Sequence, residues 1–212
     1  MLTKSALWLV RLSFGGLLFS ASIVLLGHLG ADEALSPFDS TISAYAAMDR
    51  MGPVEFGILV AGLASLALLA GMYAARIRVG GPLAASMGVG GAGFLIAALV
   101  PTVEPGTPFT AAAQVHRYAA ILGCMAFMLA GLLLIRLATT EDWTDLRFPL
   151  QVLAIVSTTA GLAVTYAMFF GDRFLIGLYE RILAGTIIAT MALVATRLLR
   201  LPRHGHAAVR RR

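Results

Sequence analysis

Long apolar segments recur along the whole chain, and they constrain its fold more than any other feature. A helix needs about 20 mostly apolar residues to cross the roughly 30 Å of hydrocarbon in a bilayer. Six segments reach that length without a charge in the middle: residues 12–30, 56–75, 82–101, 118–135, 149–171 and 174–196. Because lipid offers the backbone no hydrogen bonds, each segment must be a helix. The sequence therefore predicts an all-α integral membrane bundle of six transmembrane helices.

The composition excludes several other classes of protein. Hydrophobic residues make up 59% and charged residues 13% of the 212 residues, whereas a soluble domain is about a quarter charged and about half apolar. A water-soluble enzyme and a disordered chain are therefore excluded, and the single cysteine, Cys124, excludes a disulfide scaffold. The length suits one domain, which we expect over residues 1–201, followed by a basic tail over residues 202–212.

Charge is distributed unevenly between the two sides of this predicted bundle. Twelve of the 16 basic residues fall on the side that holds both termini, and eight of the 11 acidic residues fall on the other. Since basic loops stay in the cytoplasm, we expect cytoplasmic termini in a multi-pass protein of the inner (cytoplasmic) membrane. The first span is expected to be a retained helix, because no cleavage site leads into a soluble domain. Basic residues spread along one membrane face attract anionic lipid, so we expect no nucleic-acid partner.

The first loop, on the predicted outer side, is the longest connection between spans. Pro37 favours a turn, and either Asp39 or Ser40 can cap a helix that follows. We expect a short interfacial or partly re-entrant helix near residues 40–49, folded back on the bundle, because irregular backbone at membrane depth is tolerated only against protein or a wet cavity.

The unusual polar residues of the chain also fall on this outer side. They are His28, Asp39, Ser40, Ser43, His116, Arg117, Glu180 and Arg181. Ionisable groups near the hydrocarbon are costly unless they are paired or face a cavity. The sequence therefore predicts one polar pocket that opens toward the outer leaflet, with membrane lipid or another amphiphile as its ligand.

These residue types fit chemistry on such a ligand. His116 is the expected general base, because histidine titrates near neutral pH, and Asp39 is expected to orient it. Ser43 is expected to be a nucleophile or a ligand contact. Arg117 and Arg181 are expected to hold an anionic part of the ligand by fork-like contacts. The other expected members of the ligand site are Glu180, Ser40, Tyr45 and His28.

Two cofactor hypotheses compete with this interpretation, and the sequence specifies neither. A zinc site could form from His28, His116, Asp39 and Glu180, with one position open to water. No His-Glu-x-x-His motif supports it. A haem could lie between the two outer histidines, but haem-binding bundles more often place paired histidines well within helices.

Two further hypotheses use the same residues without a cofactor. A serine hydrolase could combine Ser40 or Ser43 with His116 and Asp39, although no nucleophile elbow is present. A purely structural alternative pairs Arg181 with Asp39 or Asp172, and Glu180 with Arg117, so that ion pairs hold the first loop over the bundle.

At this point the chain resembles a known family. The segment Ser36-Pro-Phe-Asp-Ser-Thr-Ile-Ser-Ala-Tyr45, the proline loop from Pro101 to His116, and Gly177 to Arg181 resemble the bacterial six-helix membrane proteins catalogued as domain of unknown function 998. The resemblance implies six helices and an outer polar site, with no established reaction. A weaker likeness, based on topology and an Ile-Ser loop, is to the eukaryotic six-helix family that includes a lipid-remodelling factor for glycolipid anchors.

The sequence leaves the class of function open. An enzyme that hydrolyses or modifies an amphiphile is one hypothesis. A non-catalytic protein that binds or transports a lipid or small molecule is the second, and a small subunit of a membrane complex is the third. Ion-coupled transport is disfavoured, because the chain lacks an evident internal repeat and midplane charges. The oligomeric state is not predicted.

Overall fold

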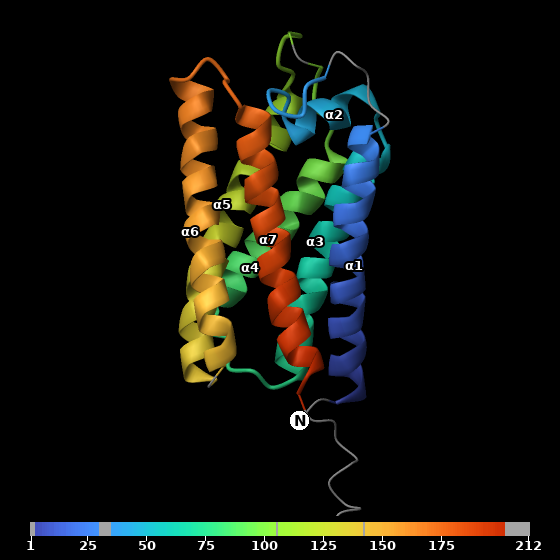
Figure 1. Ribbon diagram of the computed structural model, residues 1–212. Coiled ribbons are helices and arrows are strands. Elements are labelled where there is room, and N and C mark those ends of the chain that lie inside the picture. Colours follow the sequence, from blue (N-terminus) through green and yellow to red (C-terminus); the bar gives the residue numbers. More distant parts are fainter. Residues whose placement is uncertain (1–2, 30–34, 105, 142, 202–212) are drawn as a thin grey trace, which may run out of the picture.

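The computed structural model describes residues 3–29, 35–104, 106–141 and 143–201 (Figure 1). Within them, all regular structure is helical, in the order α1 (Lys4–Leu29), α2 (Ile42–Met48), α3 (Pro53–Ala74), α4 (Gly81–Leu99), α5 (Ala111–Thr140), α6 (Thr144–Phe169) and α7 (Ile176–Leu199). All except α2 are long and apolar enough to span a membrane. The predicted all-α fold with six membrane-spanning helices is therefore confirmed.

Most of the long helices begin before the predicted apolar segments. The fourth span was expected to begin at residue 118, but α5 begins at Ala111, where Thr110 caps it by accepting a hydrogen bond from the backbone N–H of Ala113. The fifth span was expected to begin at Pro149, which instead lies inside α6. Hydropathy marks the part of a helix that lies in lipid, whereas capped polar turns continue the helix outside it. The predicted tail, residues 202–212, lies outside the described residues.

The long helices form a closed ring of neighbours. α1 packs on α3, α3 on α4, α4 on α5, α5 on α6, α6 on α7, and α7 again on α1. Their axes run roughly side by side, with the start of α1 and the end of α7 at one end of the bundle (Figure 1). The short helix α2 lies across the opposite end, which we call the α2 end.

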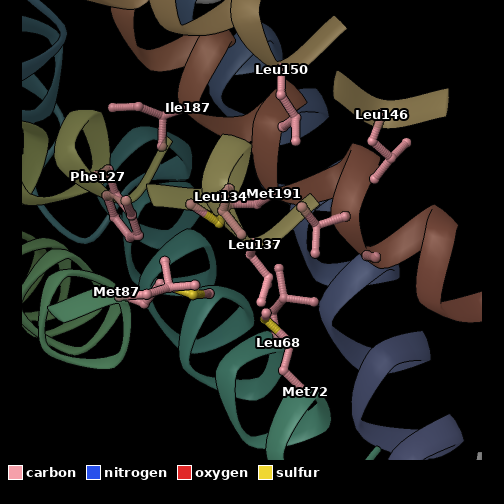
Figure 2. Packing of buried hydrophobic residues seen from close by; sticks show 14 of the residues in the cluster. Leu68, Met72, Met87, Phe127, Leu134, Leu137, Leu146, Leu150, Ile187 and Met191 are labelled. Atoms are coloured by element: carbon pink, nitrogen blue, oxygen red, sulfur yellow. The ribbon is translucent and has the colours of Figure 1, made fainter. Parts of the chain in front are cut away.

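Close packing inside the ring comes from large apolar side chains opposite small ones. Leu68, Met87, Phe127 and Met191 are buried together at the centre (Figure 2). A Cβ atom added at Gly93 of α4 would lie 2.7 Å from the carbonyl oxygen of Ala119 and 2.8 Å from Cα of Gly123 on α5. Small residues allow such close approach of helices in lipid, so α4 and α5 are held in direct backbone contact.

Candidate functional site

The segment that leads into α2 forms a compact turn at the α2 end. The backbone N–H of Ser40 donates to the carbonyl oxygen of Ser36 over 2.8 Å. Thr41 caps α2, because its hydroxyl accepts a hydrogen bond from the backbone N–H of Ala44 at 3.1 Å. The predicted cap at Asp39 or Ser40 was therefore wrong by one or two residues, whereas the expected short helix is present.

Ser43 and His116 form the central contact of this region. Oγ of Ser43 lies 3.1 Å from Nε2 of His116, and Nδ1 of His116 lies 3.0 Å from the carbonyl oxygen of Val100. A carbonyl oxygen only accepts hydrogen bonds, so Nδ1 carries the ring proton and Nε2 is free to accept one. The Ser43 hydroxyl then donates to Nε2, as a nucleophile does to its general base.

The carbonyl group of Val100 is available because α4 ends there. Val100 has ψ of 123° and precedes Pro101, and proline disfavours helical backbone at the residue before it. Carbonyl groups in the last turn of a helix have no partner within the helix. This acceptor was not predicted from the sequence, although the Val-Pro pair at the end of a predicted span was a signal for it.

Asp39 does not occupy the orienting position that was expected of it. Its Oδ1 accepts from the backbone N–H of Leu175 at 3.3 Å, and its Oδ2 accepts from the hydroxyl of Ser36 at 3.2 Å. Asp39 is exposed and joins the first loop to the turn before α7. In the structure, the carbonyl of Val100 orients His116 instead.

Two charged residues of α7 hold the first loop by its backbone. Oε2 of Glu180 accepts from the N–H of Ile42 at 2.7 Å, and Nη1 of Arg181 donates to the carbonyl oxygen of Ser40 at 2.8 Å. Gly177 lies so close that an added Cβ would collide with the carbonyl oxygens of Ser40 and Pro37. This close approach requires glycine at the start of α7.

Among the described residues, the ion pairs that the structural alternative predicted do not form. Within the described residues, the salt bridge present joins Nε of Arg197 to Oδ1 of Asp145 at 3.6 Å, in the end of the bundle opposite α2. Glu180 and Arg181 bind backbone groups because they are adjacent on α7 and the first loop presents N–H and C=O groups to both. Over residues 35–42, charged groups of α7 therefore fasten the chain through its backbone and not through an ion pair.

Tyr45 of α2 contacts His28 of α1 and Arg181 of α7. The ring of Tyr45 lies 4.3 Å from the ring of His28 and 5.0 Å from the guanidinium of Arg181, and its hydroxyl donates to the carbonyl oxygen of Leu35 at 2.8 Å. Tyr45 is only 3% exposed. Nδ1 of His28 lies 2.6 Å from the carbonyl oxygen of Val24. These two expected ligand contacts therefore pack against each other, His28 from α1 and Tyr45 from α2.

Arg117 takes a different direction from its neighbour His116. Its Nη2 lies 3.4 Å from the sulfur of Met168 on α6, and its guanidinium lies 5.6 Å from the ring centroid of Phe109. His116 and Arg181 both contact the segment from residue 40 to residue 45, which contains Ser43, whereas Arg117 lies toward α6.

A family model described as "Protein of unknown function (DUF998)" matches residues 14–197. The chain belongs to this family. No curated protein and no solved structure matches the chain. The match to DUF998 runs from α1 into α7, so it includes every element that builds the α2 end. The expected resemblance is thereby confirmed, and the description of the family names no reaction.

Metal-ligating residues do not gather in the described part of this DUF998 protein. No three His, Cys, Asp or Glu side chains among those residues converge as a bound metal ion would require. The carboxylate groups of Asp39 and Glu180 bind separate backbone N–H groups of the turn and of α2. The zinc hypothesis therefore gains no support from the geometry.

Among the described residues, neither of two open surface cavities is lined by Ser43 or His116. The first, of about 380 Å³, lies at the α2 end and is lined by Met168, Phe169, Phe170, Asp172 and Arg173. The second, of about 600 Å³, lies between α5 and α6 and is mainly apolar. His116 is 2% exposed, so the Ser43–His116 pair is covered in this conformation.

Proposed function

We propose that this protein is a membrane-embedded hydrolase or acyltransferase that acts on an ester or amide bond of an amphiphile. The observation that carries the proposal is the contact between Oγ of Ser43 and Nε2 of His116, with Nδ1 of His116 bound to a carbonyl oxygen. Two hydrogen bonds thus join the nucleophile Ser43, the base His116 and the orienting carbonyl of Val100. This is the kind of arrangement that activates a serine hydroxyl.

The proposed chemistry follows from the protonation of His116. As Oγ of Ser43 bonds to the substrate's carbonyl carbon, its proton passes to Nε2. The protonated His116 then gives that proton to the leaving alcohol or amine as the scissile bond breaks. A water or a second alcohol next attacks the acyl-serine and loses its proton to Nε2. As the acyl–Oγ bond breaks, His116 returns this proton to Oγ of Ser43, which releases the acid or the new ester. Throughout these steps Nδ1 keeps its proton, which it donates in a hydrogen bond to the carbonyl oxygen of Val100.

The location supports an amphiphilic substrate. Ser43 lies on α2, at the end of six membrane-spanning helices, where a lipid's ester bonds meet the polar headgroup layer. The basic termini favour placing the α2 end on the outer side of the inner membrane. The expected pocket then forms when the segment before α2 moves away from α7, because His116 is covered while Glu180 and Arg181 hold that segment.

The burial of His116 also favours a second candidate function. A bond between Ser43 and His116 would fasten α2 to α5 in a protein that binds or transports lipid without changing it. The two functions differ in whether the hydroxyl of Ser43 is nucleophilic, and this difference can be measured directly.

The test is covalent labelling of the purified protein in lipid nanodiscs with a fluorophosphonate, which reacts with activated serines. We expect peptide mass spectrometry to find the label on Ser43. General base catalysis contributes about 10²–10⁴-fold, so His116→Gln should slow labelling by about two orders of magnitude. Ser22→Ala, which removes an exposed hydroxyl elsewhere on the bundle, should change nothing. Labelling of Ser43 at equal rates with and without His116 contradicts the proposal, as does the absence of any label on Ser43.

A further inference from the structure

Arg117 is a cation without a suitable partner. Its contacts are a sulfur atom, which is a weak acceptor, and the face of the Phe109 ring. Within the described residues it forms no salt bridge, and its Nε is buried without a hydrogen-bond partner. Burying a charge is costly unless it is paired and hydrogen-bonded, so this guanidinium is suited to bind an anion from outside the chain.

Arg117 contacts a residue that lines an open surface cavity. Met168, whose sulfur Arg117 contacts, also lines the cavity of about 380 Å³ at the α2 end. Arg173 lies in the wall of the same cavity and brings a second positive charge. This volume is at the lower end of the range of about 300–1,000 Å³ for small-molecule sites. It therefore suits a headgroup, while the exposed rings of Phe169 and Phe170 continue the wall as an apolar surface.

The turn that carries Arg173 is held in a strained conformation. Asp172 and Arg173 have φ of 46° and 64°, and Leu175 has φ of 52°. Such a backbone conformation is costly for a residue with a side chain and persists only where the surroundings fix it. The backbone N–H of Arg173 donates to the carbonyl oxygen of Ala167 at 2.9 Å, which fixes the turn against the end of α6. Arg173 is therefore held at the cavity wall by the backbone.

We propose that Arg117 and Arg173 bind the phosphodiester group of an amphiphile in this cavity. Guanidinium groups match phosphate oxygens by two parallel hydrogen bonds. Asp172 in the same wall disfavours a second negative charge, so a diester fits better than a monoester, and its carboxylate can accept a hydrogen bond from a headgroup hydroxyl or ammonium. The inference rests on the proposed function only where it makes the bound molecule the substrate of Ser43; the binding itself does not require that serine.

The test measures binding of phosphatidylglycerol with a fluorescent acyl chain to the purified full chain, with fluorescent diacylglycerol as the phosphate-free comparison. We expect phosphatidylglycerol to bind more tightly, and the double variant Arg117→Gln/Arg173→Gln to lose about tenfold in affinity, as removing charge-assisted hydrogen bonds predicts. Arg50→Gln, which removes one exposed charge at the same end, should bind like the wild type. The site is refuted if the double variant binds like Arg50→Gln, or if both lipids bind equally.

Two further arms separate the sources of the phosphodiester and the two proposals. Competition by water-soluble glycerophosphoglycerol supports a free phosphodiester as the ligand, whereas its failure to compete supports a membrane lipid. Ser43→Ala should leave phosphatidylglycerol binding unchanged. If the fluorophosphonate never labels Ser43 while binding still depends on Arg117 and Arg173, the proposed function fails and this site stands. The opposite pair of results refutes this site alone.

Discussion

Single charged residues at the α2 end act on backbone groups. Glu180 illustrates the point, because its carboxylate accepts the N–H of Ile42, the first residue of α2, at 2.7 Å. That N–H belongs to the first turn of a helix and therefore has no partner within the helix. What α2 needs at this point is an acceptor, and a negative charge is only one way to supply it.

Substitution of Glu180 separates these two properties. Glu180→Ala leaves the N–H of Ile42 unpaired, and we expect it to lower the free energy of unfolding by about 1–3 kcal/mol. Glu180→Gln keeps a side-chain oxygen at the same place, so we expect a clearly smaller loss. Both are measured by reversible unfolding in mixed micelles. An alanine variant as stable as the wild type would contradict the role of this hydrogen bond, and equal losses in both variants would show that the charge is what matters.

At the scale of helices, the position of the Ser43–His116 pair depends on how closely α4 approaches α5. α4 supplies the carbonyl of Val100, and α5 supplies His116. The two helices are in backbone contact at Gly93, where a Cβ would come within 2.7 Å of the carbonyl oxygen of Ala119. A side chain there must push the helices apart or shift one along the other.

We therefore expect Gly93→Ala to destabilise the bundle by about 1–3 kcal/mol, the usual cost of overpacking. Gly88→Ala is the matched control on the same helix, since its added Cβ meets no atom within 4 Å. It should be neutral or slightly stabilising, because alanine favours helix over glycine by about 1 kcal/mol. Unfolding in mixed micelles compares the two, and equal stability of both variants would show that this contact does not limit the approach of α4 to α5.

The helices were predictable because apolar length alone decides what crosses a bilayer. The short helix was predictable within about two residues, since turn residues act locally, although its cap is Thr41 and not Asp39 or Ser40. The partners within the site were not. Asp39 and Val100 both had a residue type or position that could orient His116, and only the path of the first loop over α7 decides between them. Hydrogen bonds between residues 73 positions apart, as in Ser43 and His116, leave no periodic signal in one sequence.

For the whole molecule, the sidedness of the bundle determines which leaflet the α2 end meets. The asymmetry of basic residues predicts that the termini are cytoplasmic and that α2 lies on the outer side. Thr107 is exposed in the loop between α4 and α5, at the α2 end, and Thr139 is exposed near the end of α5, at the other. Single cysteines at these two positions can therefore report the orientation, in a background where Cys124→Ala removes the native thiol.

We expect a membrane-impermeant maleimide to label Thr107→Cys in intact spheroplasts, and to label Thr139→Cys only after the membrane is permeabilised. The physical reason is the cost of moving basic loops across the membrane, which the side with the termini would incur in the opposite orientation. The reverse labelling pattern would place Ser43 and Arg117 at the cytoplasmic leaflet. The chemistry of the two proposed sites would then be unchanged, but their lipid would have to come from the inner leaflet, and the charge asymmetry of the loops would need another explanation.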